Sequence, residues 1–348
     1  MKRQALSAIL TVVIIVLLGV LGVIIILPLV KEARPTQVKV LVERTVSSLP
    51  IFFARSYHTW GENPADTIQK GDIFTRKEVK LEVTVDEEVN AENAIKALNE
   101  GEAQFAILYW PDVLSWMDEH PEDTLLCFLS IEFKEIRPVE GLFPGKGLKF
   151  EKITDLEKKK VGIPHGSKIP FLSVLGSVDI DPASLVIEEH SEEDLLKGLE
   201  DENLDLIYVY EPFYTKARVH LAEPFAGGGL LPNWIGAPYH AAGLFTTTGY
   251  YKENKQGVIR MYLAMNRAVR EIEQSDSDSL GAFLGSLFGI EDPQLTTRIS
   301  VPEYYLVQAI SDFDIQNLAD RLEIYGIINT AVDLEELGVF LKQTDLKE

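Results

Sequence analysis

A stretch of 26 residues near the amino terminus, residues 5–30, carries no charged side chain, and 21 of its residues are apolar. At about 1.5 Å rise per residue, a helix of this length spans the roughly 30 Å hydrocarbon core of a bilayer. A cleavable signal peptide has a shorter apolar region, about 7–15 residues, followed by small residues. Here the stretch ends at residues 28–34 with the sequence PLVKEAR, which has no convincing A-x-A cleavage pattern. We expect residues 1–34 to form a transmembrane anchor that contacts the lipid bilayer through residues 5–30, with cleavage as the alternative.

Charge divides the sequence into two unequal parts. The chain has 33 Lys and Arg residues against 54 Asp and Glu residues, a formal net charge of −21. Residues 1–34 sum to +3, so the remaining residues sum to −24. Lys2 and Arg3 precede the apolar stretch and favour an amino terminus inside the cell. We expect the acidic body to be extracytoplasmic, on a single-pass protein of the cell membrane. Its net charge argues against a protein that binds nucleic-acid backbone over a broad face, because clustered Lys and Arg carry phosphate binding.

Sequence motifs of common enzymes and metal sites are absent. Cys127 is the one cysteine, which excludes an internal disulfide and a cysteine-rich metal site. The six histidines show no H-E-x-x-H spacing, and the sequence has no G-x-S-x-G elbow, phosphate loop or dinucleotide-binding glycine motif. We therefore expect no catalytic residues, no cofactor and no metal ion.

After residue 35 the sequence alternates between strand and helix patterns. Strands are expected at 38–42, 79–85, 105–109, 160–164, 185–187 and 206–210, and helices at 91–100, from Pro111, at 169–178 and from Ser191. This order predicts an α/β fold with parallel strands and helical crossovers. The pattern restarts near Lys160 and becomes mainly helical after about residue 240. We expect lobe I at 35–130, an inserted lobe II at 131–236, and the second part of lobe I with C-terminal helices at 237–348.

Ligands of open parallel sheets bind beyond the carboxyl ends of the strands. Four expected strands are followed by residues suited to binding, namely Ser47 and Ser48, Tyr109 and Trp110, His165 with Gly166 and Ser167, and Tyr210 with Glu211. Each group also has a purely structural interpretation, because serines cap helices, aromatic rings pack in cores and acids begin helices. Glu192, Glu193 and Asp194 are expected to be a solvated helix start.

Residues 153–218 resemble substrate-binding proteins of ABC transporters for nitrate, sulfonates, taurine and thiamine precursors, the type II periplasmic binding proteins. Residues 155–167 read DLEKKKVGIPHGS, which is similar to the family pattern D-L-x-G-K-x-V-[GA]-x-x-x-G-S. Residues 205–213 read DLIYVYEPF and end, as in that family, with an aromatic residue, an acid and proline. Residues 93–106 resemble the family's helix-glycine-strand step, with Gln104 in place of the usual acid.

The resemblance implies two lobes, each a mixed, mostly parallel sheet flanked by helices, with the ligand in the cleft between them. It implies that the candidate residues at 165–167 and 210–211 face the ligand from lobe II, and those at 47–48 and 109–110 from lobe I. The implied function is a solute-binding protein that delivers a small organic or anionic solute to an ABC permease. The aromatic candidates, with Trp234 and Tyr239 more distant, favour an organic or heteroaromatic ligand over nitrate.

Two alternatives to transport stay open from the sequence. The same cleft could belong to a ligand-sensing module that signals to a membrane partner. The fold is also shared with a thiamine-pyrimidine synthase, although the cysteine-rich iron site expected of that activity is absent and His165 is the one histidine within a matched motif.

Overall fold

The structure, a computed structural model, describes residues 36–56, 73, 77, 79–85, 91–121, 125–330, 332–334 and 340. The expected membrane anchor at residues 5–30 lies outside the described residues. Within those residues, no helix combines the length and apolar character needed to cross a membrane.

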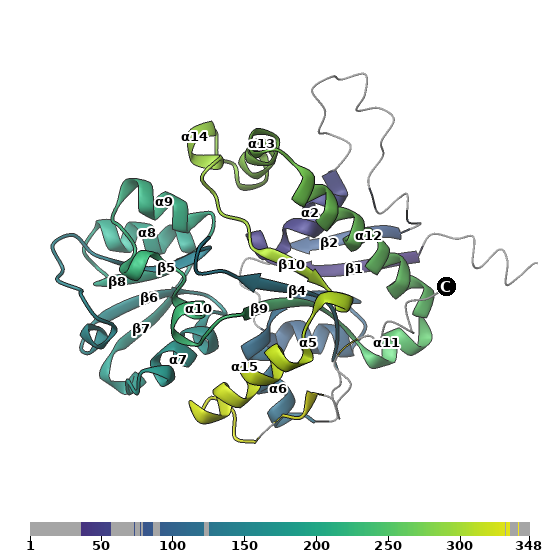
Figure 1. Cartoon of the computed structure of the whole chain (residues 1–348), viewed down its shortest axis with the longest axis horizontal. Helices are drawn as coiled ribbons and strands as arrows, with labels where there is room; N and C mark the ends of the chain where they lie inside the picture. Colours follow the sequence, from purple (N-terminus) through teal and green to yellow (C-terminus); the bar gives the residue numbers. More distant parts are fainter. Residues whose placement is uncertain are drawn as a thin grey trace, which may run out of the picture.

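The strands form two sheets, which make the two lobes seen in Figure 1. The first lobe contains a sheet of strand order β10-β4-β9-β3-β1-β2, and the second lobe a sheet of order β5-β8-β6-β7. The strands are β1 (Thr36–Val42), β2 (Val79–Val85), β3 (Phe105–Tyr109), β4 (Leu125–Phe133), β5 (Glu140–Pro144), β6 (Lys160–Pro164), β7 (Val186–His190), β8 (Leu206–Tyr210), β9 (Tyr239–Thr247) and β10 (Glu303–Leu306). The expected two-lobed α/β architecture is confirmed.

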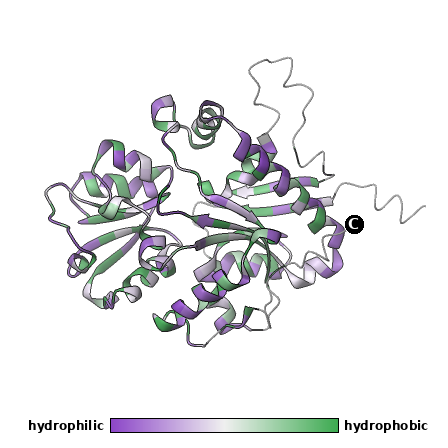
Figure 2. Ribbon diagram, viewed as in Figure 1, coloured by the Kyte–Doolittle hydropathy of each residue, from purple (hydrophilic) through white to green (hydrophobic). Residues whose placement is uncertain are grey.

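Helices cover both sheets, and Figure 2 shows that they carry hydrophilic as well as hydrophobic stretches. They are α2 (Leu49–Ser56), α5 (Ala91–Asn99), α6 (Trp110–Glu119), α7 (Lys168–Ser177), α8 (Glu192–Glu200), α9 (Phe213–His220), α10 (Leu230–Trp234), α11 (Thr248–Glu253), α12 (Lys255–Gln274), α13 (Ser277–Phe288), α14 (Pro293–Thr296) and α15 (Asp312–Ile324). The longest, α12, buries an apolar face against α2 and β1. Helix α8 begins as expected, because the Ser191 hydroxyl accepts a hydrogen bond from the Asp194 N–H.

Strand directions differ between the lobes and correct one expectation. In the second lobe, β6 pairs in parallel with β7 and β8, and β5 is the antiparallel edge strand. In the first lobe, β1 is parallel to β2 and β3, but the β3–β9, β4–β9 and β4–β10 pairs are antiparallel. A mostly parallel sheet was therefore the wrong prediction for the first lobe.

The antiparallel pairs of the first sheet result from the path of the chain between the lobes. The chain leaves the first sheet after β4 through residues 134–139 and returns through residues 235–238 into β9, which runs back beside β4. Strand β9 has the sequence YHAAGLFTT, whose alanines and glycine have weak strand propensity. The sequence therefore predicted no strand there. Strands β4, β5 and β10 were not predicted either. The residue bounds proposed for the lobes stay a prediction.

Candidate functional site

A cavity of about 150 Å³ lies between the lobes, at the carboxyl ends of β3, β6, β7 and β8. Both lobes line it. The lining residues are Glu43, Arg44, Thr45, Tyr109, Pro164, His165, Ser167, His190, Ser191, Glu192, Glu193, Tyr210, Pro212, Phe213, Lys216 and Phe288. This position is the strand-end edge where the sequence predicted binding, and it brings together Tyr109, His165, Ser167 and Tyr210.

Two tyrosines, one from each lobe, meet at the wall of the cavity. Tyr109 ends β3 just before α6, and Tyr210 ends β8 just before the turn into α9. Their rings are stacked, with centroids 5.7 Å apart and an interplanar angle of 30°. Burial raises the pKa of both phenols above the usual range, so both hydroxyls are neutral hydrogen-bonding groups at physiological pH.

The turn at residues 165–167 follows β6 and leads into α7. Gly166 has φ +73°, a left-handed conformation that glycine adopts without strain. Ser167 occupies the N-cap position of α7 and is 1% exposed, yet its side chain makes no capping hydrogen bond. The hydroxyl of Ser167 is therefore not used to cap the helix, although its sequence position suggested that alternative.

The acidic start of α8 borders the cavity. Glu193 and Asp194 are exposed, as expected of a solvated helix start, whereas Glu192 is half-buried. Glu192 and Glu193 line the cavity, and Glu192 Oε1 accepts a hydrogen bond of 3.3 Å from the Tyr210 N–H. Burial raises the pKa of Glu192, as does the charge of Glu43 opposite. The signal available in the sequence was the position of these acids after β7, at the same sheet edge as the other candidates.

Further cavity residues were not predicted from the sequence. Glu43, Arg44 and Thr45 follow β1, and Lys216 and Phe213 lie on α9. The Lys216 ammonium lies 4.3 Å from the centroid of the Phe213 ring, which is the distance of a cation–π contact. Charge at the cavity wall is thus mixed, with carboxylates and cations on neighbouring residues.

Ser47, Ser48, Trp110 and Glu211 do not line the cavity. The two serines are buried in a short 3-10 turn, Val46–Ser48, that leads into α2. Trp110 is fully buried, and its Nε1–H donates to Ser130 Oγ at 3.1 Å. Glu211 is also fully buried, where Oε1 accepts from the Ser300 N–H at 2.9 Å and from the Thr215 hydroxyl at 2.7 Å.

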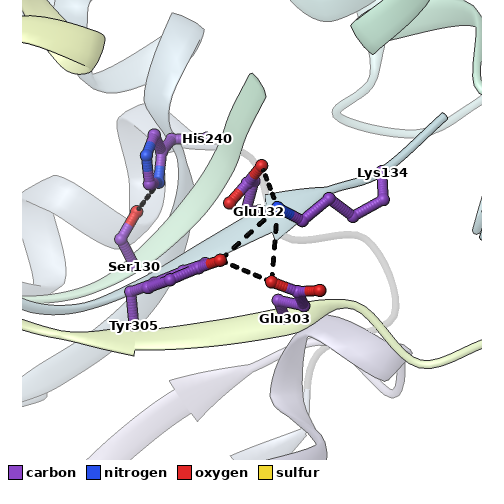
Figure 3. A network of polar contacts seen from close by, with 6 residues as sticks. All are labelled: Ser130, Glu132, Lys134, His240, Glu303 and Tyr305. Atoms are coloured by element: carbon purple, nitrogen blue, oxygen red, sulfur yellow. Dashed lines mark hydrogen bonds and ion pairs between the residues drawn. The ribbon is translucent and has the colours of Figure 1, made fainter. Parts of the chain in front are cut away.

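Figure 3 shows a second polar network, which lies on β4, β9 and β10 of the first lobe. Ser130 Oγ lies 2.9 Å from His240 Nδ1, and Lys134 Nζ forms ion pairs with Glu132 at 2.6 Å and Glu303 at 3.3 Å. Ser130 is fully buried and also accepts the Trp110 Nε1–H bond, so it is not placed as a nucleophile. These contacts tie the three strands together.

Comparison with known proteins gives one match to a family model, described as NMT1/THI5 like, over residues 76–275, which is more than half of the chain. The chain belongs to the NMT1/THI5-like family. No curated protein matches the sequence. The expected relationship to solute-binding proteins of ABC importers is confirmed at the level of this family and of the fold.

Solved structures share the fold at low sequence identity. The alkanesulfonate-binding protein SsuA from Xanthomonas axonopodis pv. citri, bound to MOPS, is 16% identical with a TM-score of 0.66 over 89% of this chain and 99% of that chain. A ligand-binding component of an ABC-type import system from Staphylococcus aureus, with zinc bound, is 11% identical with a TM-score of 0.63 over 90% and 98%. The Candida albicans CA3427 product, with the generic periplasmic binding protein fold, is 13% identical with a TM-score of 0.63 over 88% and 96%.

These likenesses identify the fold of this NMT1/THI5-like protein as the type II periplasmic binding fold, with two mixed sheets. Among the described residues, no group of three or more His, Cys, Asp or Glu side chains is arranged to hold a metal ion. The residues at the cavity are aromatic, hydroxyl, imidazole and charged groups that suit reversible binding of a small molecule.

Proposed function

We propose that this protein is the extracytoplasmic solute-binding component of an ABC-type importer, and that it holds a small solute between its lobes. The observation that carries the proposal is the interlobe cavity, which aligns Tyr109 of one lobe with Ser167 and Tyr210 of the other. A ligand held by both lobes stabilises the closed arrangement, which is how two-lobed binding proteins couple binding to a hinge motion. His165 and the Gly166 backbone are further contacts in this proposal.

The solute is released unchanged to an ABC permease in the membrane, and residues 1–34 tether the body to the bilayer. Family membership and the fold of the sulfonate-binding and import-system proteins support this role. The apolar residues 5–30 support the tether. We propose no catalytic residues, because the buried Ser130–His240 pair lies outside the cavity.

The direct test is to purify the full chain from its native membrane and identify the released small molecules by mass spectrometry. We expect one kind of solute at a molar ratio of about one per protein chain. We also expect to recover that solute unchanged after it has been incubated with the purified protein. Conversion of the solute into a product would establish an enzyme instead. Absence of any solute, with no stabilisation by added candidates, would overturn the proposal.

Topology is tested by adding protease to cells whose outer membrane or cell wall has been removed and whose cytoplasmic membrane is still sealed. We expect the acidic body to be digested while the cytoplasmic marker proteins survive. Full protection of the body would contradict the extracytoplasmic orientation.

A further inference from the structure

A contact between two helices joins the lobes away from the cavity. Helix α7 packs on the sheet of the second lobe, and α15 packs on β9 and α6 of the first. The two helices meet at Gly176 of α7 and Tyr325, the C-cap residue of α15. Figure 1 shows these helices on the same side of the molecule, one on each lobe. Neither residue lines the cavity, so the lobes touch at a second place that a bound solute does not occupy.

The close approach of the two helices requires the absence of a side chain at Gly176. A Cβ atom there would lie 2.7 Å from Tyr325 Cβ, a distance that folded proteins essentially never show, and 3.0 Å from the Tyr325 carbonyl oxygen. Backbone and Cβ atoms cannot rotate away, as the end of a long side chain can. Relief of such an overlap would therefore require α7 and α15 to move apart.

Helix α15 is fixed to the first lobe. Ile315 and Leu322 are fully buried in the core. Beyond the helix, the Asp118 carboxylate of α6 accepts hydrogen bonds from the Asn329 N–H at 2.8 Å and from the Thr330 N–H at 3.0 Å. The end of α15 therefore moves together with the first lobe, and a push at the α7 contact acts on the lobes as wholes.

The same helix contacts the chain where it crosses between the lobes. The Arg321 guanidinium donates a hydrogen bond to the Ile235 carbonyl oxygen, at the start of the crossover 235–238. Gly236 lies so close to this guanidinium that a Cβ atom would overlap it. Arg321 precedes Tyr325 by about one helical turn, so one helix holds both the crossover and the contact with α7. A change in the angle between the lobes therefore disturbs at least one of these two contacts.

The contact with α7 is present in an arrangement in which the lobes also meet at the cavity. The rings of Tyr109 and Tyr210, one from each lobe, are stacked there with centroids 5.7 Å apart. When a protein binds its ligand in one of two arrangements, the apparent affinity scales with the fraction of the free protein in that arrangement. A contact outside the cavity that favours the closed arrangement thus raises the affinity without touching the solute.

We propose that the contact between α7 and α15 favours the closed lobes and so sets the affinity for the solute from outside the cavity. This inference rests on the proposed solute-binding function, and it assigns Gly176 and Tyr325 as positioning residues. Disruption of the contact opens the lobes of the solute-free protein. The apparent affinity then falls although every side chain of the cavity is intact.

Double electron–electron resonance measures the balance between open and closed lobes without a ligand. His220→Cys on α9 and Gln274→Cys on α12 place one spin label at an exposed position of each lobe, and Cys127 is fully buried. The sample is the full chain in detergent micelles, dialysed free of solutes. The small molecules released from native protein are then added back, and we expect them to shift the wild-type distances toward the closed population.

Gly176→Ala should lower the closed fraction of the solute-free protein about threefold or more, and the apparent affinity by the same factor. Alanine favours a helix more than glycine does, so the change does not weaken α7 itself. Gly198→Ala on α8 is the matched control, because its Cβ would meet Leu204 Cδ1 at 2.7 Å inside the second lobe. It should leave distances and affinity unchanged. The melting temperature of each variant shows whether it folds.

A double-mutant cycle assigns the effect to the contact itself. Gly176→Ala should act less in a Tyr325→Gly background, where the nearest atom is missing. Equal distance distributions in Gly176→Ala and wild type would overturn the proposal, and so would a larger closed fraction in the variant. A solute-induced shift in the wild type would then leave solute binding intact. No such shift, with no solute recovered from native protein, would overturn the solute-binding function as well.

Discussion

The ring of Tyr109 from the first lobe lies stacked on the ring of Tyr210 from the second, with their centroids 5.7 Å apart. Each ring comes from the last residue of a buried strand, so its position is set by a rigid sheet rather than by a loop. The pair therefore spans the interlobe boundary at a place where lobe movement changes the distance between the two rings. A ligand bound there contacts both lobes at once.

Replacement of the Tyr109 ring tests whether the ring contributes to solute binding. Tyr109→Ala should weaken solute binding about twofold to tenfold, because an aromatic contact contributes about 0.5–1.5 kcal/mol beyond area burial. Phe313→Ala, which removes a 72% exposed ring on α15, is the control and should leave affinity unchanged. Isothermal titration with the recovered solute measures both. Equal affinity in Tyr109→Ala would remove the ring pair from the site.

Ser167→Ala tests the hydroxyl that does not cap α7. Loss of one hydrogen bond to the ligand should cost about 0.5–1.5 kcal/mol of binding free energy, whereas helix stability should change little since no cap is lost. Ser191→Ala is the informative comparison, because the Ser191 hydroxyl does cap α8 and its loss should lower the unfolding free energy by about 1 kcal/mol. A large loss of stability in Ser167→Ala would show a structural role.

Trp110 is expected to act on stability and not directly on the ligand. It is fully buried and packs edge-on against Phe245, with centroids 4.8 Å apart. Trp110→Ala should lower the free energy of unfolding by about 3–5 kcal/mol, and Trp110→Phe by a smaller amount, mainly through the lost bond to Ser130. Urea denaturation measures both. A Trp110→Phe variant with full stability and no solute binding would place the indole at the ligand.

Asp112 contributes to the pH dependence of stability, together with Glu140 and Glu211, whose pKa values burial raises to about 7. Its folded-state pKa of about 8 lies above the ordinary value of 3.8, so the native state holds its proton more tightly than the unfolded chain. That contribution is present below pH 4 and is lost as the pH rises to about 8. The free energy of unfolding should therefore fall between pH 5 and pH 8, and Asp112→Asn should flatten the slope. Glu119→Gln should keep the wild-type slope, and a slope unchanged in Asp112→Asn would show that Asp112 titrates normally.

Glu211 of the second lobe is hydrogen-bonded to the segment that leads into β10. Its buried carboxylate accepts from Ser300 N–H and from both the N–H and the hydroxyl of Thr215. Thr215→Val keeps the side-chain shape but deprives the carboxylate of one donor, which should lower the unfolding free energy by about 1–3 kcal/mol. Thr297→Val in the neighbouring segment is the matched control, because it removes an exposed hydroxyl that donates to Pro293 O at 3.0 Å and does not contact Glu211. Equal unfolding curves for Thr215→Val and wild type would contradict this role of Glu211.

Local pattern predicted most strands of the βαβ units correctly. Strands at 79–85, 105–109, 160–164 and 206–210 have the predicted bounds, because each is an apolar or alternating run between turn residues. The strand-end rule also predicted that Tyr109, His165, Ser167 and Tyr210 would meet. That rule depends only on strand order, which the sequence pattern carries.

The direction of side chains and the pairing of strands far apart in the sequence could not be predicted from the local sequence pattern. Glu192 could be recognised as the acidic first turn of a helix, but its turn toward Tyr210 depends on how β7 and β8 lie in one sheet. Trp110 follows Tyr109 directly, and successive residues at a strand end point to opposite sides, so one ring reaches the cavity and the other the core. The sequence alone could not show which of the two rings, Tyr109 or Trp110, reaches the cavity.

By itself, then, the sequence determined the apolar amino-terminal stretch, the acidic body, the α/β pattern and the strand-end candidates, because these depend on composition and on neighbours along the chain. Only the tertiary structure decided the antiparallel insertion of β9, the burial of Trp110 and Glu211, and the stacking of Tyr109 on Tyr210. Those features arise from contacts between residues far apart in sequence, whose burial and electrostatics exist only once both lobes have folded.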